Sequence, residues 1–106
     1  MSNYQNIGIA YFTNKAMEIE PIGKIVEGVM TTVANRVPVR KVDINSEVTI
    51  VEKLKPQNVP CIIFTNNAGD LEHMRLDGGI QLQGITVEKI METVAAIDRF
   101  NRGEKV

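Results

Sequence analysis

Asn58-Val59-Pro60-Cys61-Ile62-Ile63-Phe64 is the stretch of this chain that is most informative about its fold. The residues from Cys61 to Phe64 are apolar without interruption, which is typical of a short strand buried on both faces. A Val-Pro dipeptide stands directly before them, and Cys61 is the only cysteine among the 106 residues. The stretch therefore predicts a buried strand entered through a proline, and it leaves one thiol for any cysteine chemistry.

The length and composition of the chain predict one globular domain, residues 1–106. Hydrophobic residues make up 43% of the sequence, so an ordinary core needs neither disulfides nor metals. The formal net charge is −1, with acidic and basic residues interspersed, and aromatic residues make up only 5%. These values argue against nucleic acid or an anionic membrane as the main partner, because both favour a basic face.

Several kinds of site and location are disfavoured by what the sequence contains. One cysteine excludes an intrachain disulfide and a cysteine-built zinc site, and His73 is the only histidine, so we expect no metal and no cofactor. No apolar run approaches the ~20 residues of a membrane helix. Residues 1–6 show neither the basic nor the apolar region of a signal peptide. We therefore expect a cytoplasmic protein.

The first part of the chain predicts strand, helix and strand. Residues 7–12 are an almost unbroken apolar run, as in a strand buried on both faces. Residues 20–35 repeat apolar side chains at steps of three and four, which predicts an amphipathic helix with Pro21 in its first turn. Residues 37–44 predict a second strand. Pro38 places it at a sheet edge, because proline cannot donate a hydrogen bond to a neighbouring strand.

A second helix and a hairpin are expected next. Asn45 or Ser46 can cap the helix, and Pro56 ends it. After the buried strand that starts at Cys61, residues 66–70 carry a strong turn signal. Residues 71–76 are then expected to pair back as an antiparallel strand.

The last part of the chain predicts a connector and a helix. Residues 80–85 show no pattern that favours helix or strand. A helix is expected from about Thr86 to Gly103, with a frayed tail at 104–106. The complete order is β-α-β-α-β-β-α. It predicts an α/β fold with a central mixed four-stranded sheet flanked by three helices.

This order of elements resembles the thioredoxin-like superfamily across nearly the whole chain. Several features carry the resemblance. The first strand ends in Phe12, Pro21 lies early in the following helix, and Val42-Asp43-Ile44 ends the second strand before a short helix. Val59-Pro60 opens the third strand, and Gly78-Gly79 follows the hairpin. The resemblance implies a thioredoxin-like fold. It also implies that the Val59-Pro60 peptide bond is cis and lies beside a shallow groove.

The chain departs from this family where the redox enzymes carry their chemistry. Those enzymes have Cys-x-x-Cys between the first strand and the first helix, where one thiol attacks a disulfide and the other resolves the mixed disulfide. Residues 13–18 of this chain are Thr-Asn-Lys-Ala-Met-Glu and contain no cysteine. Composition therefore excludes dithiol exchange, and we expect a redox-inactive domain.

The resemblance places a peptide-binding groove between three segments. Substrates of the family dock on the backbone at the position of Val59, which is physically the addition of a strand. We therefore expect a protein or peptide partner. The candidate binding residues are Lys15, Met17, Glu18, Val59, Pro60, Gly78 and Gly79.

Two alternatives stay open at this point. Cys61 is a candidate catalytic residue for a monothiol oxidoreductase or a thiol sensor. Against this, a thiol at the start of a buried strand, with no cation near it in sequence, is normally inert. The chain is alternatively a structural subunit that forms homo-oligomers through a sheet edge or a helix face. Thiol labelling tests the first alternative, and a mass measurement in solution tests the second.

Overall fold

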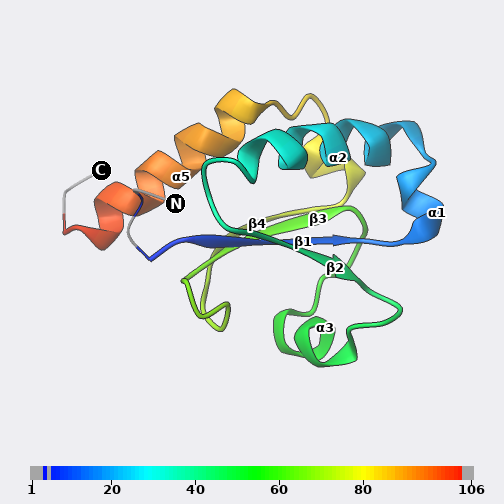
Figure 1. Cartoon of the computed structure of the whole chain (residues 1–106), viewed down its shortest axis with the longest axis horizontal. Helices are drawn as coiled ribbons and strands as arrows, with labels where there is room; N and C mark the ends of the chain where they lie inside the picture. The colour runs from blue at the N-terminus through cyan, green and yellow to red at the C-terminus, as the bar shows by residue number, and fades with distance from the viewer. Residues whose placement is uncertain (1–3, 5, 104–106) are drawn as a thin grey trace.

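A computed structural model describes residue 4 and residues 6–103, which form a layered α/β structure (Figure 1). The helices and strands, in chain order, are β1 (Gly8–Thr13), α1 (Lys15–Glu18), α2 (Pro21–Val33), β2 (Val39–Asp43), α3 (Val48–Leu54), β3 (Cys61–Thr65), β4 (Glu72–Asp77), α4 (Gly79–Leu82) and α5 (Val87–Asn101). The four strands make one sheet, and the two longest helices, α2 and α5, run over it.

The strands follow the order β2-β1-β3-β4 across the sheet. β1 and β2 pair in parallel, whereas β3 pairs antiparallel with both of its neighbours. β2 lies at an edge, as the proline before it predicts. The Pro38 carbonyl accepts the Ile9 N–H at 2.9 Å, so the proline joins the pairing only as an acceptor. This is the mixed four-stranded sheet that the sequence predicts.

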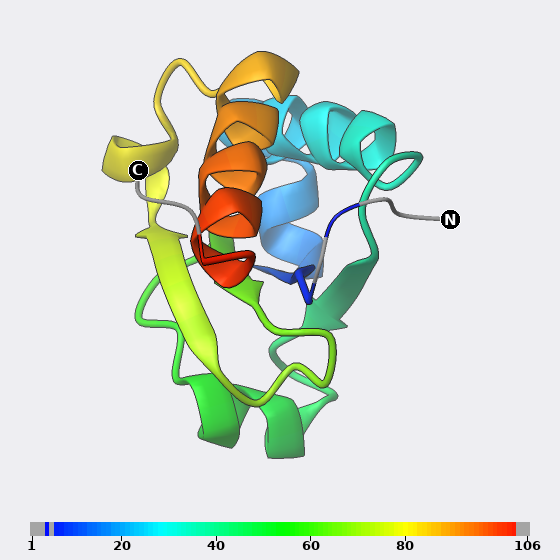
Figure 2. The same ribbon diagram turned by 90° about the vertical axis from the view of Figure 1, so that its left-hand side faces the viewer.

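The two faces of the sheet are covered unequally. α2 and α5 lie side by side over one face, and α3 lies on the other (Figures 1 and 2). Successive residues of a strand point to opposite faces. Ile9 and Tyr11 therefore face α2 and α5, while Ala10 and Phe12 face α3. Because both faces bury apolar side chains, β1 is an unbroken apolar run.

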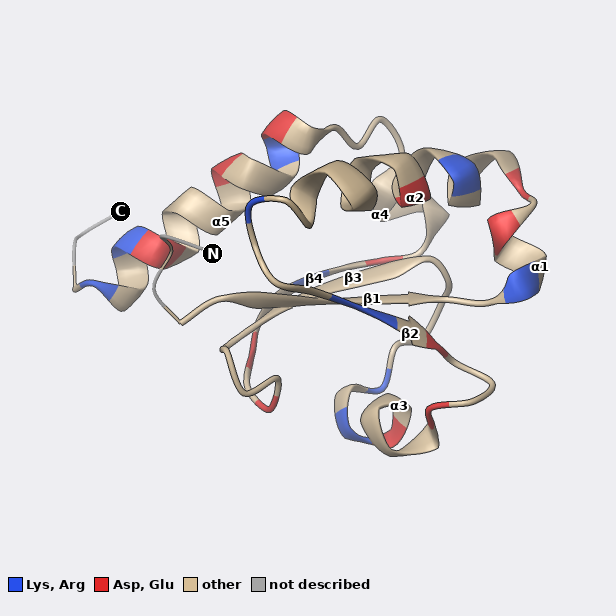
Figure 3. Cartoon of the chain, viewed as in Figure 1, with Lys and Arg blue, Asp and Glu red and all other residues tan. Residues whose placement is uncertain are grey.

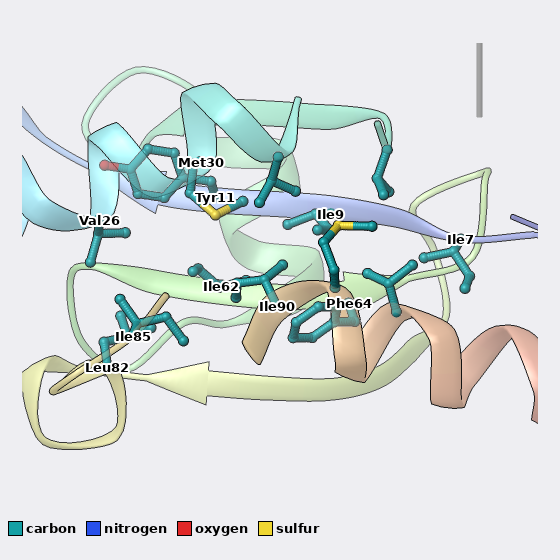
Figure 4. Close-up of a cluster of buried hydrophobic side chains, with 14 residues drawn as sticks. Ile7, Ile9, Tyr11, Val26, Met30, Ile62, Phe64, Leu82, Ile85 and Ile90 are labelled. Carbon is teal, nitrogen blue, oxygen red and sulfur yellow. The ribbon is translucent and has the colours of Figure 1, made fainter. Parts of the chain in front are cut away.

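The larger of two buried clusters fills the space between the sheet and the two long helices (Figure 4). Each helix contributes an apolar stripe at steps of three and four residues, such as Val26 and Met30 on α2 and Ile90 and Val94 on α5. The side chains labelled in Figure 4 are Ile7, Ile9, Tyr11, Val26, Met30, Ile62, Phe64, Leu82, Ile85 and Ile90. The smaller cluster, on the α3 face, contains Ala10, Phe12, Val42, Ile50, Leu54, Cys61 and Ile63.

Two short helices add to the three that the sequence predicts. Residues 15–18, expected as a loop, form α1. α4 begins at Gly79, one residue before the connector expected at 80–85, and occupies its first three residues. The described residues thus form five helices. The Asn14 side chain caps α1 by accepting the Met17 N–H at 2.7 Å. Helices of four residues are too short to show a helical period in the sequence, so pattern analysis does not find them.

The start of α3 differs from the prediction. The residue before the helix is Glu47, not Asn45 or Ser46, and its side chain does not cap the helix. Instead, the Asn45 N–H donates to the Asp43 carboxylate at 2.9 Å, and the Glu47 carboxylate accepts the Asp43 N–H at 3.1 Å. The turn is therefore organised by the two carboxylates on either side of the expected caps.

The remaining helix boundaries lie close to the predictions. α2 ends at Val33, two residues before the predicted end. α5 begins after Thr86, whose hydroxyl accepts the Lys89 N–H at 3.2 Å, and Gly103 has the positive φ of a glycine that follows a helix. The tail at 104–106 lies outside the described residues. Among the described helices, none is both long enough and apolar enough to cross a membrane.

Candidate functional site

The three segments predicted to form a groove lie at the same end of the sheet. Phe12 of β1 pairs with Cys61 of β3, and Cys61 pairs with Asp77 of β4. The residues that follow β1, precede β3 and follow β4 therefore emerge together, at the right-hand end of Figure 1. The sheet topology therefore places these three segments next to one another. The contacts of their individual residues differ from one segment to the next.

Val59 has unpaired backbone groups. The Val59-Pro60 bond is cis, the isomer that the resemblance implies, and Val59 itself is half-buried. The next carbonyl, that of Pro60, already accepts the Gly78 N–H at 3.0 Å. Neither the N–H nor the C=O of Val59 has a hydrogen-bond partner among the described residues. Val59 therefore offers one donor and one acceptor.

The loop before Val59 is held by a carboxylate on β4. The two oxygens of Asp77 accept the backbone N–H groups of Gln57 at 3.0 Å and Asn58 at 2.9 Å. Burial by itself would raise the pKa of Asp77, but these two donors and the nearby Arg75 guanidinium outweigh it and lower the pKa. Asp77 is therefore charged at neutral pH and fixes the approach of the chain to Val59.

Arg75, two residues earlier on the same strand face, fixes the end of α3. Its guanidinium donates to the carbonyls of Leu54 at 2.6 Å and Lys55 at 3.0 Å, which the helix leaves without internal partners. It also pairs with Glu72 at 2.6 Å and with Asp77 at 3.3 Å. The hydrogen bond to Arg75 is the largest cause of the lowered pKa of Glu72. This network ties β4 to both α3 and the loop after it.

Arg75 and Asp77 were not predicted as site residues from the sequence. The available signal was the spacing Arg75-x-Asp77, which puts two opposite charges on one face of an edge strand. The sequence does not show what that face meets, because the end of α3 and the loop at 56–59 arrive there only through tertiary packing.

Gly78 is a packing residue and not an exposed contact. It is buried, its amide is bound to Pro60, and its φ is +96°. A Cβ atom at this position would lie 3.1 Å from the Asn58 Cβ. Both the backbone conformation and the close approach favour glycine here. The exposed residues of this segment are instead Gly79 and its neighbour Ile80, whose side chain is 92% exposed.

Two of the three predicted contacts on α1 are partly buried by the packing of this helix. α1 sits so close to α2 that a Cβ atom at Gly23 would lie 1.8 Å from the Met17 carbonyl oxygen. Met17 and Glu18 are half-buried, and Lys15 is exposed. Glycine at position 23 is therefore what lets α1 lie against α2 at this end of the sheet.

Glu18 takes part in an ion-pair cluster that includes β2 and α2. Lys41 contacts Glu18 at 2.7 Å and Glu27 at 3.0 Å, and the Tyr11 hydroxyl donates to Glu27 at 3.1 Å. The hydrogen bond to Glu18 is the largest cause of the raised pKa of Lys41. Burial, followed by the negative charge of Glu27, raises the pKa of Tyr11 to about 12. Glu18 thus anchors α1, which leaves Lys15 as the freely exposed charged residue of the predicted contacts.

Cys61 is enclosed at the start of β3. Its side chain is 0% exposed and belongs to the smaller apolar cluster. Burial raises the pKa of the thiol to about 12, and the negative charge of the neighbouring Asp77 acts in the same direction. A neutral, enclosed thiol is a poor nucleophile. Among the described residues no cluster of His, Cys, Asp and Glu has the arrangement of a metal site.

A hollow adjoins Val59 on the side of α3. It has a volume of about 460 Å³, and its apolar walls are the half-buried side chains of Ile44, Val51, Pro56 and Val59. The predicted contacts on α1 and at Gly78-Gly79 do not line it. Val59 is therefore the predicted residue that combines unpaired backbone groups with an apolar pocket.

The comparisons with known proteins give the class of fold. No protein-family model and no curated protein matches the sequence. Among solved structures, a mutant thioredoxin from Halobacterium salinarum is similar with a TM-score of 0.67 and 13% identity, over 87% of this chain and 74% of that one. Thioredoxin-2, described as a component of malaria parasite protein secretion machinery, has a TM-score of 0.66 and 14% identity, over 91% of this chain and 96% of that one.

A chloroplastic thioredoxin z is similar at 23% identity with a TM-score of 0.57, over 89% of this chain and 80% of that one. Together with the sheet order, these similarities show that the chain has a thioredoxin-like fold, and they confirm the fold class predicted from the order of its elements.

Proposed function

We propose that this chain is a redox-inactive thioredoxin-like domain that binds an extended segment of a protein partner at Val59. The observation that carries the proposal is the pair of unpaired backbone groups of Val59, set between fixed neighbours. Asp77 holds the amides of the two preceding residues, and Gly78 holds the carbonyl of Pro60. A strand that pairs with Val59 would meet backbone groups that are already ordered, which lowers the entropic cost of binding.

The absence of redox activity is supported by the single cysteine and its surroundings. Burial raises the pKa of Cys61 to about 12, so the thiol stays protonated at neutral pH. Attack on a disulfide needs the thiolate and access to it. The monothiol alternative would therefore require the side chains that cover Cys61 on the α3 face to move aside.

The hollow beside Val59 suggests what the bound segment contains. Side chains of an extended strand alternate between two directions. A residue next to the one that pairs with Val59 can point toward Ile44, Val51 and Pro56, where an apolar side chain would lose contact with water. We therefore expect a binding preference for one aliphatic residue in the segment.

A selection of linear peptides from a random display library against the folded protein tests this function. Selected peptides should carry an aliphatic residue and should shift the backbone amide signals of Val59 and Val51. Val51→Lys, which places a long charged chain at the hollow, should weaken binding about tenfold or more, the loss expected for one apolar anchor. The matched control is Val48→Lys, because Val48 lies on the same helix, is 55% exposed and does not line the hollow.

Three results would contradict the proposal. The first is a library that yields no specific peptide. The second is equal weakening by the two lysine variants. The third is a protein whose mass in solution is that of a stable oligomer, with the signals near Val59 already altered by self-association. That last result would favour the structural homo-oligomeric subunit.

A further inference from the structure

A second concave site lies on the α3 face, near the first residues of β1 and β2. α3 and the turn between β3 and β4 project from this face of the sheet (Figures 1 and 2). Between them lies a groove of about 430 Å³. The residues that line this groove include Gly8, Ala10, Arg40, Thr49, Ile50 and Lys53. Val59 does not line this groove, so the site is independent of the proposed peptide site.

The floor of the groove is open because two small residues stand in the first half of β1. Gly8 and Ala10 point to the α3 face, and Ile50 of α3 forms an apolar wall. The φ of Gly8 is not positive, and a Cβ atom there would have its nearest neighbour, the Asn66 carbonyl oxygen, at 3.4 Å. Neither the backbone conformation nor the available space therefore requires glycine at position 8. The glycine leaves a space that a methyl group would fill.

The rim of the groove is positively charged. Arg40 on β2 pairs with Glu47 at 3.1 Å, whereas Lys53 on α3 has no ion-pair partner among the described residues. Figure 3 shows basic residues on both of these elements. No Asp or Glu is found among the described residues that line the groove. A ligand with a negative group would thus meet Lys53, which has no counter-ion among the described residues, and Arg40, which is already paired with Glu47.

We propose that this groove binds a small amphiphilic carboxylate. Its apolar body lies against Ala10 and Ile50, and its carboxylate pairs with Lys53. The volume falls within the range of about 300 to 1,000 Å³ that is usual for small-molecule sites. The apolar side chains of Ala10 and Ile50 and the cationic rim match the two parts of such a ligand. Neither a purely polar anion nor a neutral apolar molecule matches both.

Three probes separate the contributions of the two parts of the ligand. Octanoate carries both the apolar chain and the carboxylate, 1-octanol lacks the charge, and acetate lacks the chain. Titrated into ¹⁵N-labelled protein, octanoate should shift the amide signals of Gly8, Ala10, Thr49 and Lys53. We expect 1-octanol to bind about threefold to fivefold more weakly, the factor expected for one exposed ion pair. Acetate should leave these signals in place.

Two pairs of variants test whether octanoate binds in this groove. Gly8→Ala fills the floor and should weaken octanoate binding about fivefold or more, as overpacking of a close-fitting site does. Its control is Gly28→Ala, because a Cβ atom at Gly28 on α2 would have no neighbour within 4 Å. Lys53→Gln should reduce octanoate binding to the level of 1-octanol. Its control, Lys24→Gln, removes an exposed lysine from α2 on the opposite side of the sheet.

The proposal is overturned by any of three results: equal affinities for octanoate and 1-octanol, octanoate shifts confined to residues outside the groove, or undiminished binding to a folded Gly8→Ala variant. The amide spectrum of each variant shows whether it is folded, so loss of structure is not mistaken for loss of binding. Because Val59 lies elsewhere, none of these results bears on the peptide site.

Discussion

The two faces of the sheet are built from the same strands but depend on different interactions. On one face, α2 and α5 cover a large cluster of apolar side chains. On the other, the seven residues of α3 cover a smaller cluster, and Arg75 and Asp77 hold the end of that helix and the loop that follows it. Apolar packing therefore stabilises the fold, whereas a polar network positions the candidate site. Both concave sites, beside Val59 and above Gly8, lie on the more thinly covered face.

The largest expected effect is the protection of Cys61 from a thiol reagent, which tests whether the α3 face excludes solvent. Cys61 lies on that face, is fully buried and has a pKa of about 12. A thiol reagent at neutral pH should therefore label native protein on the order of 10³-fold more slowly than unfolded protein, because labelling requires the structure to open. Equal rates would show an accessible thiol and would return the monothiol alternative to first place.

A matched pair of core substitutions compares the two faces directly. Ile62→Ala removes a fully buried side chain from the α2 and α5 face and should lower the free energy of unfolding by about 4 kcal/mol. Ile50→Ala, at a residue 9% exposed on the α3 face, should lower it by about 2 kcal/mol, because the space left there is more open to water. Chemical denaturation measures both. Equal losses would mean that the faces are equally well packed.

Removal of Asp77 from the polar network should lower the stability of the whole protein and also loosen the loop at 56–59. Asp77→Ala leaves the amides of Gln57 and Asn58 without their acceptor, and it should cost about 2 kcal/mol of stability. Hydrogen exchange at these two amides should accelerate more than exchange within α2. Glu52→Ala, at an exposed residue of α3, serves as the control. Unchanged exchange at Gln57 and Asn58 would show that Asp77 does not hold the loop.

The same network predicts a loss of stability in acid. The pKa values of Asp77 and Glu72 are lowered in the folded protein, so the unfolded chain takes up protons first as the pH falls. Their contribution is present above the unfolded pKa of about 4 and is lost as the pH falls through the folded value. Urea denaturation between pH 6 and pH 3 should therefore show a weaker pH dependence in Asp77→Ala than in the unchanged protein. The same pH dependence in both proteins would show that Asp77 does not contribute to the loss of stability in acid.

The sequence predicted the apolar parts of the fold well. β1, β3 and the two long helices were found because each has an apolar run or period long enough to recognise. α1 and α4 were missed because four residues cannot show a period. The caps expected at Asn45 and Ser46 were wrong because Asp43 and Glu47 organise that turn through their own side chains.

The site was predictable only in outline. The resemblance located Val59 and the two neighbouring segments at one end of the sheet, but it did not show that Gly78 is buried or that Glu18 is paired with Lys41. The network of Arg75 and Asp77 depends on contacts between residues about 20 positions apart in the chain, and the hollow beside Val59 is lined by residues from separate segments. Local sequence patterns carry no information on such contacts.

Hydrogen exchange at Val59 tests the proposed function most directly, because the Gly78 amide provides an internal comparison. The Gly78 N–H is already bonded to the Pro60 carbonyl, whereas the Val59 N–H has no partner among the described residues. When a selected peptide saturates the protein, exchange at Val59 should slow about tenfold or more, as for an amide newly paired in a strand, and exchange at Gly78 should change little. Saturation with no change at Val59 would contradict the account, because the peptide would then be bound without pairing to this backbone.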